Sequence, residues 1–154
     1  MVNWEKCRPD FKPDGSLRDI YVLATSTREW DVALSVVRDS ATSLAFSIDG
    51  VARPLPPSAS EVFALSRDRS ALLTFDYAAV PFSCHFFAED EIELSLAPND
   101  ISSPDRLDAL AEFLRTLGRR IGRDVLLTPE NLPTSPILRY SVSSGSVEWQ
   151  PPLA

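Results

Sequence analysis

The sequence predicts an α+β fold, a single domain with a mostly antiparallel sheet and two or three helices packed on one face. Short stretches with strand character are separated by tight turns in the middle of the chain, which is typical of an antiparallel meander. Only a few stretches have apolar residues at helical spacing. The regular helical crossovers that a doubly wound parallel sheet requires are missing.

Eight stretches are predicted to be strands, because they are rich in β-branched and aromatic residues or alternate between apolar and polar positions. They span residues 19–24, 44–48, 72–76, 80–87, 91–96, 125–127, 137–142 and 147–149. The stretch 91–96 alternates strictly, so Glu91 and Glu93 are expected to face away from the core. In 80–87 the same alternation places His85 on the outer face.

Three helices are predicted where a polar cap precedes apolar residues at helical spacing. The caps are Ser26 with Glu29, Ser58 with Glu61, and Ser102 or Ser103 before Pro104. The third helix has the strongest pattern, with leucines at three- and four-residue spacing and an end near Gly122. The arginines in its C-terminal half suit the helix dipole, so we expect a solvated face there and not an anion-binding site.

We expect one domain over residues 1–154, with a polar N-terminal leader over about residues 1–17 and a proline-rich tail over 150–154. A length of 154 residues is ordinary for one domain. Hydrophobic residues make up 44% and charged residues 24%, which excludes general disorder. Neither a secretory signal nor a membrane-spanning run is recognised, so the expected location is the cytoplasm, with reduced thiols.

The negative charge is concentrated in one part of the chain. The formal net charge is −7, so the chain is not expected to bind nucleic acid through a basic surface of its own. Residues 70–105 contain seven of the 22 acidic residues and none of the 15 lysines and arginines. The whole excess of negative charge therefore lies in about a quarter of the sequence.

No catalytic residue, cofactor or metal ligand is predicted. The common phosphate-binding, metalloprotease and nucleophile motifs are missing, and the chain has only five glycines. His85 is the single histidine, and the two cysteines, Cys7 and Cys84, lie far apart in the sequence, so a zinc site of ordinary composition is nearly excluded. Cys84 lies between two phenylalanines on the apolar face and is expected to be a small core residue.

The acidic stretch that follows the histidine is the main candidate for function. The candidate residues are His85, Glu89, Asp90, Glu91 and Glu93. They are open to three interpretations: a solvated turn and outer face, a pair of carboxylates for acid/base or metal chemistry, or a docking surface for a basic partner. Clustered charge of one sign speeds association and selects partners, which favours docking over catalysis.

Three stretches together resemble a known class of protein. They are Leu17-Arg18-Asp19-Ile20-Tyr21-Val22, Cys84-His85-Phe86-Phe87 with the acids after it, and Leu127-Thr128-Pro129-Glu130-Asn131. In this order, around a single late helix, they resemble a class of small bacterial proteins that are found beside polymorphic toxins. These are the presumed immunity proteins. The similarity spans most of the chain, and none of the three stretches is a catalytic motif.

The resemblance implies a non-catalytic protein that binds one cognate toxin in the cytoplasm of the producing cell and occludes its active site. The acidic residues would dock on a basic active-site cleft, such as that of a nuclease or deaminase, with no cofactor, nucleic acid or membrane involved. One alternative is a small enzyme that uses His85 with Glu91 or Glu93, which requires a concave, partly buried histidine with a perturbed pKa. Another is a regulatory or scaffold subunit.

Overall fold

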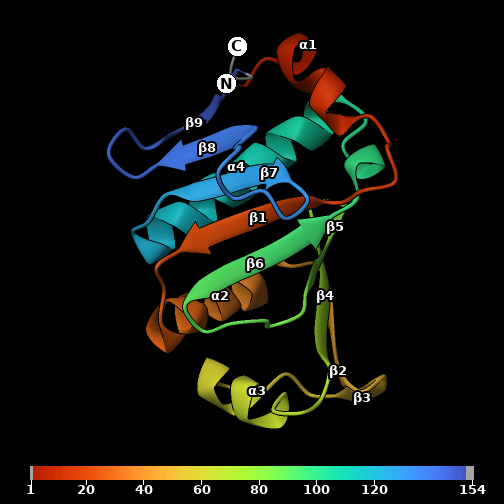
Figure 1. Cartoon of the computed structure of the whole chain (residues 1–154), viewed down its shortest axis with the longest axis vertical. Helices are drawn as coiled ribbons and strands as arrows, with labels where there is room; N and C mark the ends of the chain where they lie inside the picture. Colours follow the sequence, from red (N-terminus) through yellow and green to blue (C-terminus); the bar gives the residue numbers. More distant parts are fainter. Residues whose placement is uncertain (1, 152–154) are drawn as a thin grey trace.

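The computed structural model describes residues 2–151, and within them nine strands form one sheet in the order β3-β2-β4-β5-β6-β1-β7-β8-β9 (Figure 1). The strands are β1 (Arg18–Leu23), β2 (Ser43–Ile48), β3 (Val51–Arg53), β4 (Ala71–Tyr77), β5 (Val80–Cys84), β6 (Glu91–Leu96), β7 (Val125–Pro129), β8 (Leu138–Ser141) and β9 (Ser146–Trp149). Every neighbouring pair is antiparallel. The predicted α+β class with a mostly antiparallel sheet is therefore confirmed.

Four α-helices accompany the sheet in the described residues, where two or three were expected. They are α1 (Trp4–Cys7), α2 (Thr27–Ser40), α3 (Ala59–Leu65) and α4 (Pro104–Ile121), with two short 3-10 helices, η1 (Arg8–Phe11) and η2 (Pro98–Asp100). The additional helix, α1, is a single turn and is too short to give a periodic pattern. It lies in the predicted N-terminal leader, where Cys7 and Phe11 are buried. Most of the predicted tail, residues 152–154, lies outside the described range.

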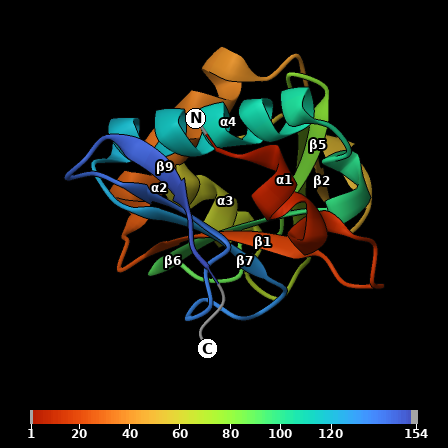
Figure 2. The ribbon, with the colours of Figure 1, turned by 90° about the horizontal axis from the view of Figure 1, so that it is seen from above.

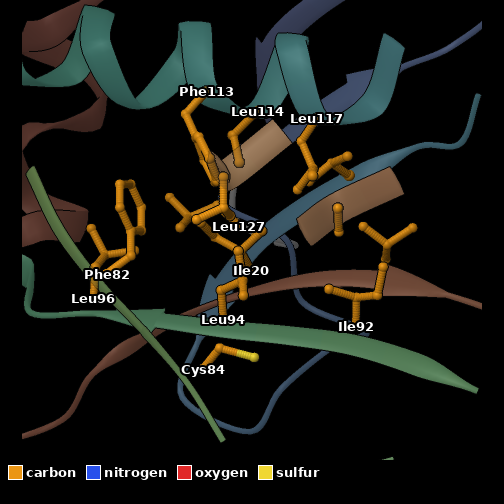
Figure 3. Packing of buried hydrophobic residues seen from close by; sticks show 14 of the residues in the cluster. Ile20, Phe82, Cys84, Ile92, Leu94, Leu96, Phe113, Leu114, Leu117 and Leu127 are labelled. Carbon is orange, nitrogen blue, oxygen red and sulfur yellow. The ribbon is translucent and has the colours of Figure 1, made fainter. Parts of the chain in front are cut away.

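The helix α4 packs its apolar stripe on one face of the sheet (Figures 2 and 3). Ser103 caps its first turn by accepting a hydrogen bond from the amide of Arg106, and Gly122 ends it in the left-handed conformation with φ +77°. Leu114 and Leu117 point toward Leu127 and other strand residues, and all three are fully buried (Figure 3). The predicted leucine stripe is confirmed as the core face of this helix.

The helices α2, α3 and α4 lie on the same side of the sheet, and no helix covers the opposite face of β6, β1 and β7 (Figures 1 and 2). In β6 every second residue is buried, so its apolar residues face the helices and its polar residues face the other way. We call the uncovered side the open face. It carries Glu91 and Glu93, as the alternation predicts.

The strand predicted over residues 80–87 is wrong in its second half, because β5 ends at Cys84. Phe86 adopts a left-handed φ of +55°, which breaks the alternation and ends the pairing. Its side chain is nevertheless buried, as predicted, although the backbone at this residue is not a strand. His85 consequently lies in a loop and not on a strand.

Candidate functional site

The open face brings acidic and hydroxyl side chains of two neighbouring strands into direct contact. In the antiparallel register of β1 and β6, Tyr21 lies opposite Glu93 and Asp19 lies opposite Ser95. Because both strands alternate in phase, these four side chains share the open face.

A buried network of hydrogen bonds links these residues. The Tyr21 hydroxyl lies 2.7 Å from Glu93 Oε1 and 3.2 Å from Asp19 Oδ2. Asp19 also accepts from the Ser95 hydroxyl at 3.0 Å and from the Asn131 amide at 2.7 Å. Asp19 and Tyr21 are only 2% and 3% exposed, whereas Glu93 is half-buried. The network therefore fixes one oxygen of an accessible carboxylate in place.

The pKa of Tyr21 is raised well above its usual value. Burial of the phenol is the largest cause, followed by its hydrogen bond to Glu93 and the nearby charge of Asp19. The hydroxyl therefore stays protonated at any physiological pH and remains available to donate. It acts as an anchor for a carboxylate and not as an acid or base.

An aromatic cluster anchors the loop between β5 and β6, residues 85–90. The Phe86 ring stacks on Trp30 with centroids 5.2 Å apart. It also meets Phe63 and Phe46 edge to face, at 5.9 and 6.1 Å. Such aromatic contacts add to the free energy of burial. The buried ring of Phe86 thus holds the middle of the loop against α2, α3 and β2.

Three hydrogen bonds fix the backbone of the same loop. The Trp30 indole Nε1 donates to the carbonyl oxygen of Ala88 at 3.1 Å. Thr25 donates from its amide to Asp90 O at 3.0 Å and from its hydroxyl to Glu89 O at 2.9 Å. The carbonyls of the acidic residues are used in folding, so their exposed side chains extend from a fixed backbone.

The loop presents His85 and Phe87 to solvent on either side of the buried phenylalanine. Their rings stack with centroids 5.3 Å apart and planes inclined by 16°. Phe87 is 73% exposed, the largest exposed fraction among the large apolar residues of the described chain. An exposed aromatic ring on a fixed backbone is typical of a contact residue in a protein interface.

His85 does not meet the carboxylates that the enzyme hypothesis assigned to it. Within residues 2–151 it forms no hydrogen bond or salt bridge with Glu91 or Glu93, and its one recorded ring contact is with Phe87. It is exposed, whereas that hypothesis requires a concave and partly buried histidine. The geometry therefore offers no support for a catalytic pair.

The acidic residues of this region remain without basic partners in the described part of the chain. Salt bridges there join Arg18–Asp14, Arg115–Glu112, Arg120–Asp39, Arg123–Glu29 and Arg139–Asp124. None of the seven acids in residues 70–105 takes part. We call Glu89, Asp90, Glu91 and Glu93 the acidic surface.

Neighbouring carboxylates of the acidic surface repel one another. Partial burial and the neighbouring charges of Glu93 and Asp90 raise the pKa of Glu91. No group of three or more histidine, cysteine, aspartate or glutamate side chains in residues 2–151 is arranged to hold a metal ion. The carboxylates are therefore crowded enough to repel one another without forming a metal-binding cluster.

The cysteines are both buried. Burial raises the pKa of the Cys84 thiol to about 12 and that of Cys7 to about 11, with the charge of Asp10 adding to the second. A thiol at these values is not nucleophilic at neutral pH. The predicted role of Cys84 as a small core residue is confirmed by its 1% exposure.

Sequence reasoning missed Tyr21 and Phe87 as members of the site. Tyr21 was expected only as a buried strand residue, and the polar residue two positions earlier, Asp19, was the clue to a hydrogen-bonded pair on the open face. Phe87 was read as the end of a strand, although an aromatic residue at an outward position next to His85 already pointed to an exposed ring.

Comparisons with known proteins give a likeness of fold. No family model matches the chain, and no curated protein matches it in sequence. No helix among residues 2–151 has the length and apolar character needed to cross a bilayer. A chain of the crystal structure of the toxic C-terminal tip of CdiA from Pseudomonas aeruginosa in complex with immune protein matches with a TM-score of 0.53 and 7% sequence identity, over 81% of this chain and 92% of that chain. The chain therefore shares its fold with a chain of this complex between a toxin tip and its immune protein.

Proposed function

We propose that this chain is a non-catalytic immunity protein that binds a cognate bacterial toxin and neutralises it by covering the toxin's active site with the acidic surface. The observation that carries the proposal is the fold shared with a chain from a complex of a CdiA toxin tip and its immune protein. The protein acts in the cytoplasm of the producing cell, where the toxin would otherwise reach its target.

The charge distribution supports a basic partner. The charges of Asp90 and Glu93 lie near Glu91, and none of the four acids of this surface forms a salt bridge in the described residues, so their field is not cancelled by direct ion pairs. A toxin that acts on nucleic acid needs a cleft lined by lysine and arginine to hold phosphates. The acidic surface would occupy that cleft in place of the substrate.

The exposed aromatic ring supports a defined contact and not only long-range attraction. Phe87 lies directly before the acidic surface in the chain, on a loop whose backbone is held by Trp30 and Thr25. A rigid loop loses little conformational entropy on binding. Phe87 is therefore the residue that would insert into an apolar pocket of the toxin, with the carboxylates around it as a charged rim.

The test is protection of a bacterial host. The chain would be expressed alone and together with the C-terminal toxin domain encoded beside it. Expressed alone, it should leave growth unchanged, and together it should restore the growth that the toxin domain abolishes. Growth arrest by this chain alone, or no protection by a folded and equally abundant protein, would contradict the proposal.

A second measurement separates active-site occlusion from binding elsewhere. The purified chain should inhibit the toxin's reaction on its substrate competitively, so that excess substrate relieves the inhibition. Inhibition that excess substrate leaves unchanged would show that the chain binds outside the active site.

A further inference from the structure

A groove of about 440 Å³ opens on the strands β2, β4, β5 and β6. The strands β5 and β6 are joined through a single residue pair, Ser83 opposite Ser95. Pro81 lies two positions before Ser83 on β5 and lacks the amide that would continue the ladder toward Ala97. The two strands therefore separate, and the groove lies at this separation.

The groove has apolar walls and a hydroxyl-rich lining. Leu17 and Leu44 line it and are 41% and 42% exposed. Ser83, Ser95 and Thr74 contribute hydroxyl groups. Such a lining can receive the aliphatic part of a long side chain and still offer hydrogen-bond acceptors to its polar end.

All charge in the lining is negative. Asp76 and Asp100 line the groove, and none of the residues around it is lysine or arginine. Both aspartates belong to the segment without salt bridges, and the recorded side-chain partner of Asp76 is the Ser43 hydroxyl at 3.1 Å. A cationic side chain would meet two carboxylates that no base already neutralises.

The groove is continuous with the site described above through Ser95. This residue lines the groove and donates its hydroxyl hydrogen bond to Asp19, which also binds the Tyr21 hydroxyl. Glu93 lies two positions along the same strand and on the same face. A partner seated on the acidic surface would therefore extend over the groove.

We propose that this groove receives one arginine or lysine side chain from a loop of the protein partner, with Asp76 and Asp100 as its counter-charges. The proposal rests on the proposed function for the existence of that partner. The groove adds a second and more specific contact to the attraction of the acidic surface. It selects a partner by the position of one cationic side chain and not by net charge alone.

The groove can be tested without any toxin. The isotope-labelled full chain would be titrated with the peptide acetyl-Gly-Arg-Gly-amide and followed by amide chemical shifts in NMR spectra. We expect saturable shifts at Ala45, Ser83 and Ser95, and none with acetyl-Gly-Glu-Gly-amide. Shifts that do not saturate, or that are confined to residues 89–93, would overturn the proposal.

Charge variants show which carboxylates bind the peptide. The double variant D76N/D100N should bind the arginine peptide at least fivefold more weakly, while E91Q/E93Q should change the affinity less than twofold. Equal weakening by both pairs would mean that the peptide senses the overall field and does not occupy the groove.

A size variant keeps the test independent of charge. Ala45 is exposed and lines the groove, so Ala45→Phe should fill it and abolish peptide binding without disturbing the core. Ser47→Phe, on the same strand outside the groove, is the matched control. Unchanged peptide binding by the folded Ala45→Phe variant would overturn the proposal. Protection from the toxin without saturable peptide binding would overturn the groove and leave the proposed function standing.

Discussion

The two faces of the sheet differ in how their side chains are used. The covered face is packed by α2, α3 and α4, and its residues are buried and apolar, as Figure 3 shows for Ile20, Leu94 and Leu127. Within residues 2–151 no helix covers the open face (Figure 1), which carries the carboxylates and hydroxyl groups of Asp19, Tyr21, Glu93 and Ser95. The apolar core therefore lies on one face, while the other combines a buried polar network around Asp19 and Tyr21 with the partly accessible carboxylates Glu91 and Glu93.

The pKa values of two acidic residues, Asp124 and Glu91, are shifted in opposite directions. Asp124 accepts a hydrogen bond from the Val142 amide and pairs with Arg139, and these contacts lower its pKa although burial opposes them. Burial and like charges raise the pKa of Glu91. The fold stabilises the ionised form of the first and disfavours that of the second. Crowded acids that weaken the fold are typical of residues kept for binding.

The largest expected effect is a loss of stability from the covered face. A Cβ atom at Gly118 would collide with the ring of Tyr140 and crowd the carbonyl of Arg123. Gly118→Val should therefore lower the free energy of unfolding by about 3 kcal/mol. Urea denaturation measures this change, and Arg119→Ala on the exposed side of the same helix is the control, expected within about 0.5 kcal/mol. A stable Gly118→Val protein would show that this helix packs differently.

The second effect concerns binding and belongs to the loop between β5 and β6. Phe87→Ala should weaken toxin binding by about 2 kcal/mol, roughly 30-fold, because a contact residue at an interface loses its ring. The free energy of unfolding should change by less than about 0.5 kcal/mol, since the ring is mostly exposed. Isothermal calorimetry gives the affinity. Val51→Ala removes another exposed apolar side chain, 66% exposed on β3, and should bind as the wild type does.

The third effect compares two buried tyrosines, one on each face. Tyr21→Phe removes the donor that holds Glu93 and should cost about 1 kcal/mol of stability. It should also speed toxin dissociation several-fold, because the carboxylate is no longer fixed. Tyr140→Phe removes a hydroxyl from the covered face and should leave dissociation unchanged. Surface plasmon resonance measures both rates, and equal dissociation for the two variants would remove Tyr21 from the site.

The smallest effect is a gain in stability from relieved repulsion. Glu91→Gln should raise the free energy of unfolding at pH 7 by about 0.5 kcal/mol. The folded pKa of Glu91 is raised, so the wild type loses stability as the pH rises from the unfolded pKa, near 4.3, through the folded value. The advantage of the variant should therefore vanish below about pH 4 and be complete at neutral pH. Glu5→Gln, which removes an exposed acid outside the acidic surface, is the control in thermal unfolding at pH 7 and should not raise the stability.

The sequence predicted those parts of the molecule that depend on local patterns. The strict alternation of 91–96 placed Glu91 and Glu93 on the outer face, and the Ser58–Glu61 capping box is complete in the structure. The box expected at Ser26 formed only in part, because its hydroxyl accepts from the amide of Arg28 instead of that of Glu29.

The parts that sequence could not predict depend on contacts between distant segments. The Tyr21–Glu93 hydrogen bond depends on the pairing of β1 with β6, which no local pattern encodes. The left-handed backbone at Phe86 is maintained by aromatic contacts with three other elements. The groove depends on how far β5 and β6 remain paired, which the residue types of either strand alone do not determine.

The proposed neutralisation depends most on whether the acidic surface guides the toxin to its binding site. The most direct test is the association rate of the toxin with the double variant E91K/E93K, measured by stopped-flow fluorescence at several salt concentrations. The control is E5K/E148K, which reverses two exposed acids elsewhere and changes the net charge equally. We predict that E91K/E93K associates at least tenfold more slowly and loses most of its salt dependence, while the control stays within about twofold of the wild type. Equal association rates for the two folded variants would contradict the account.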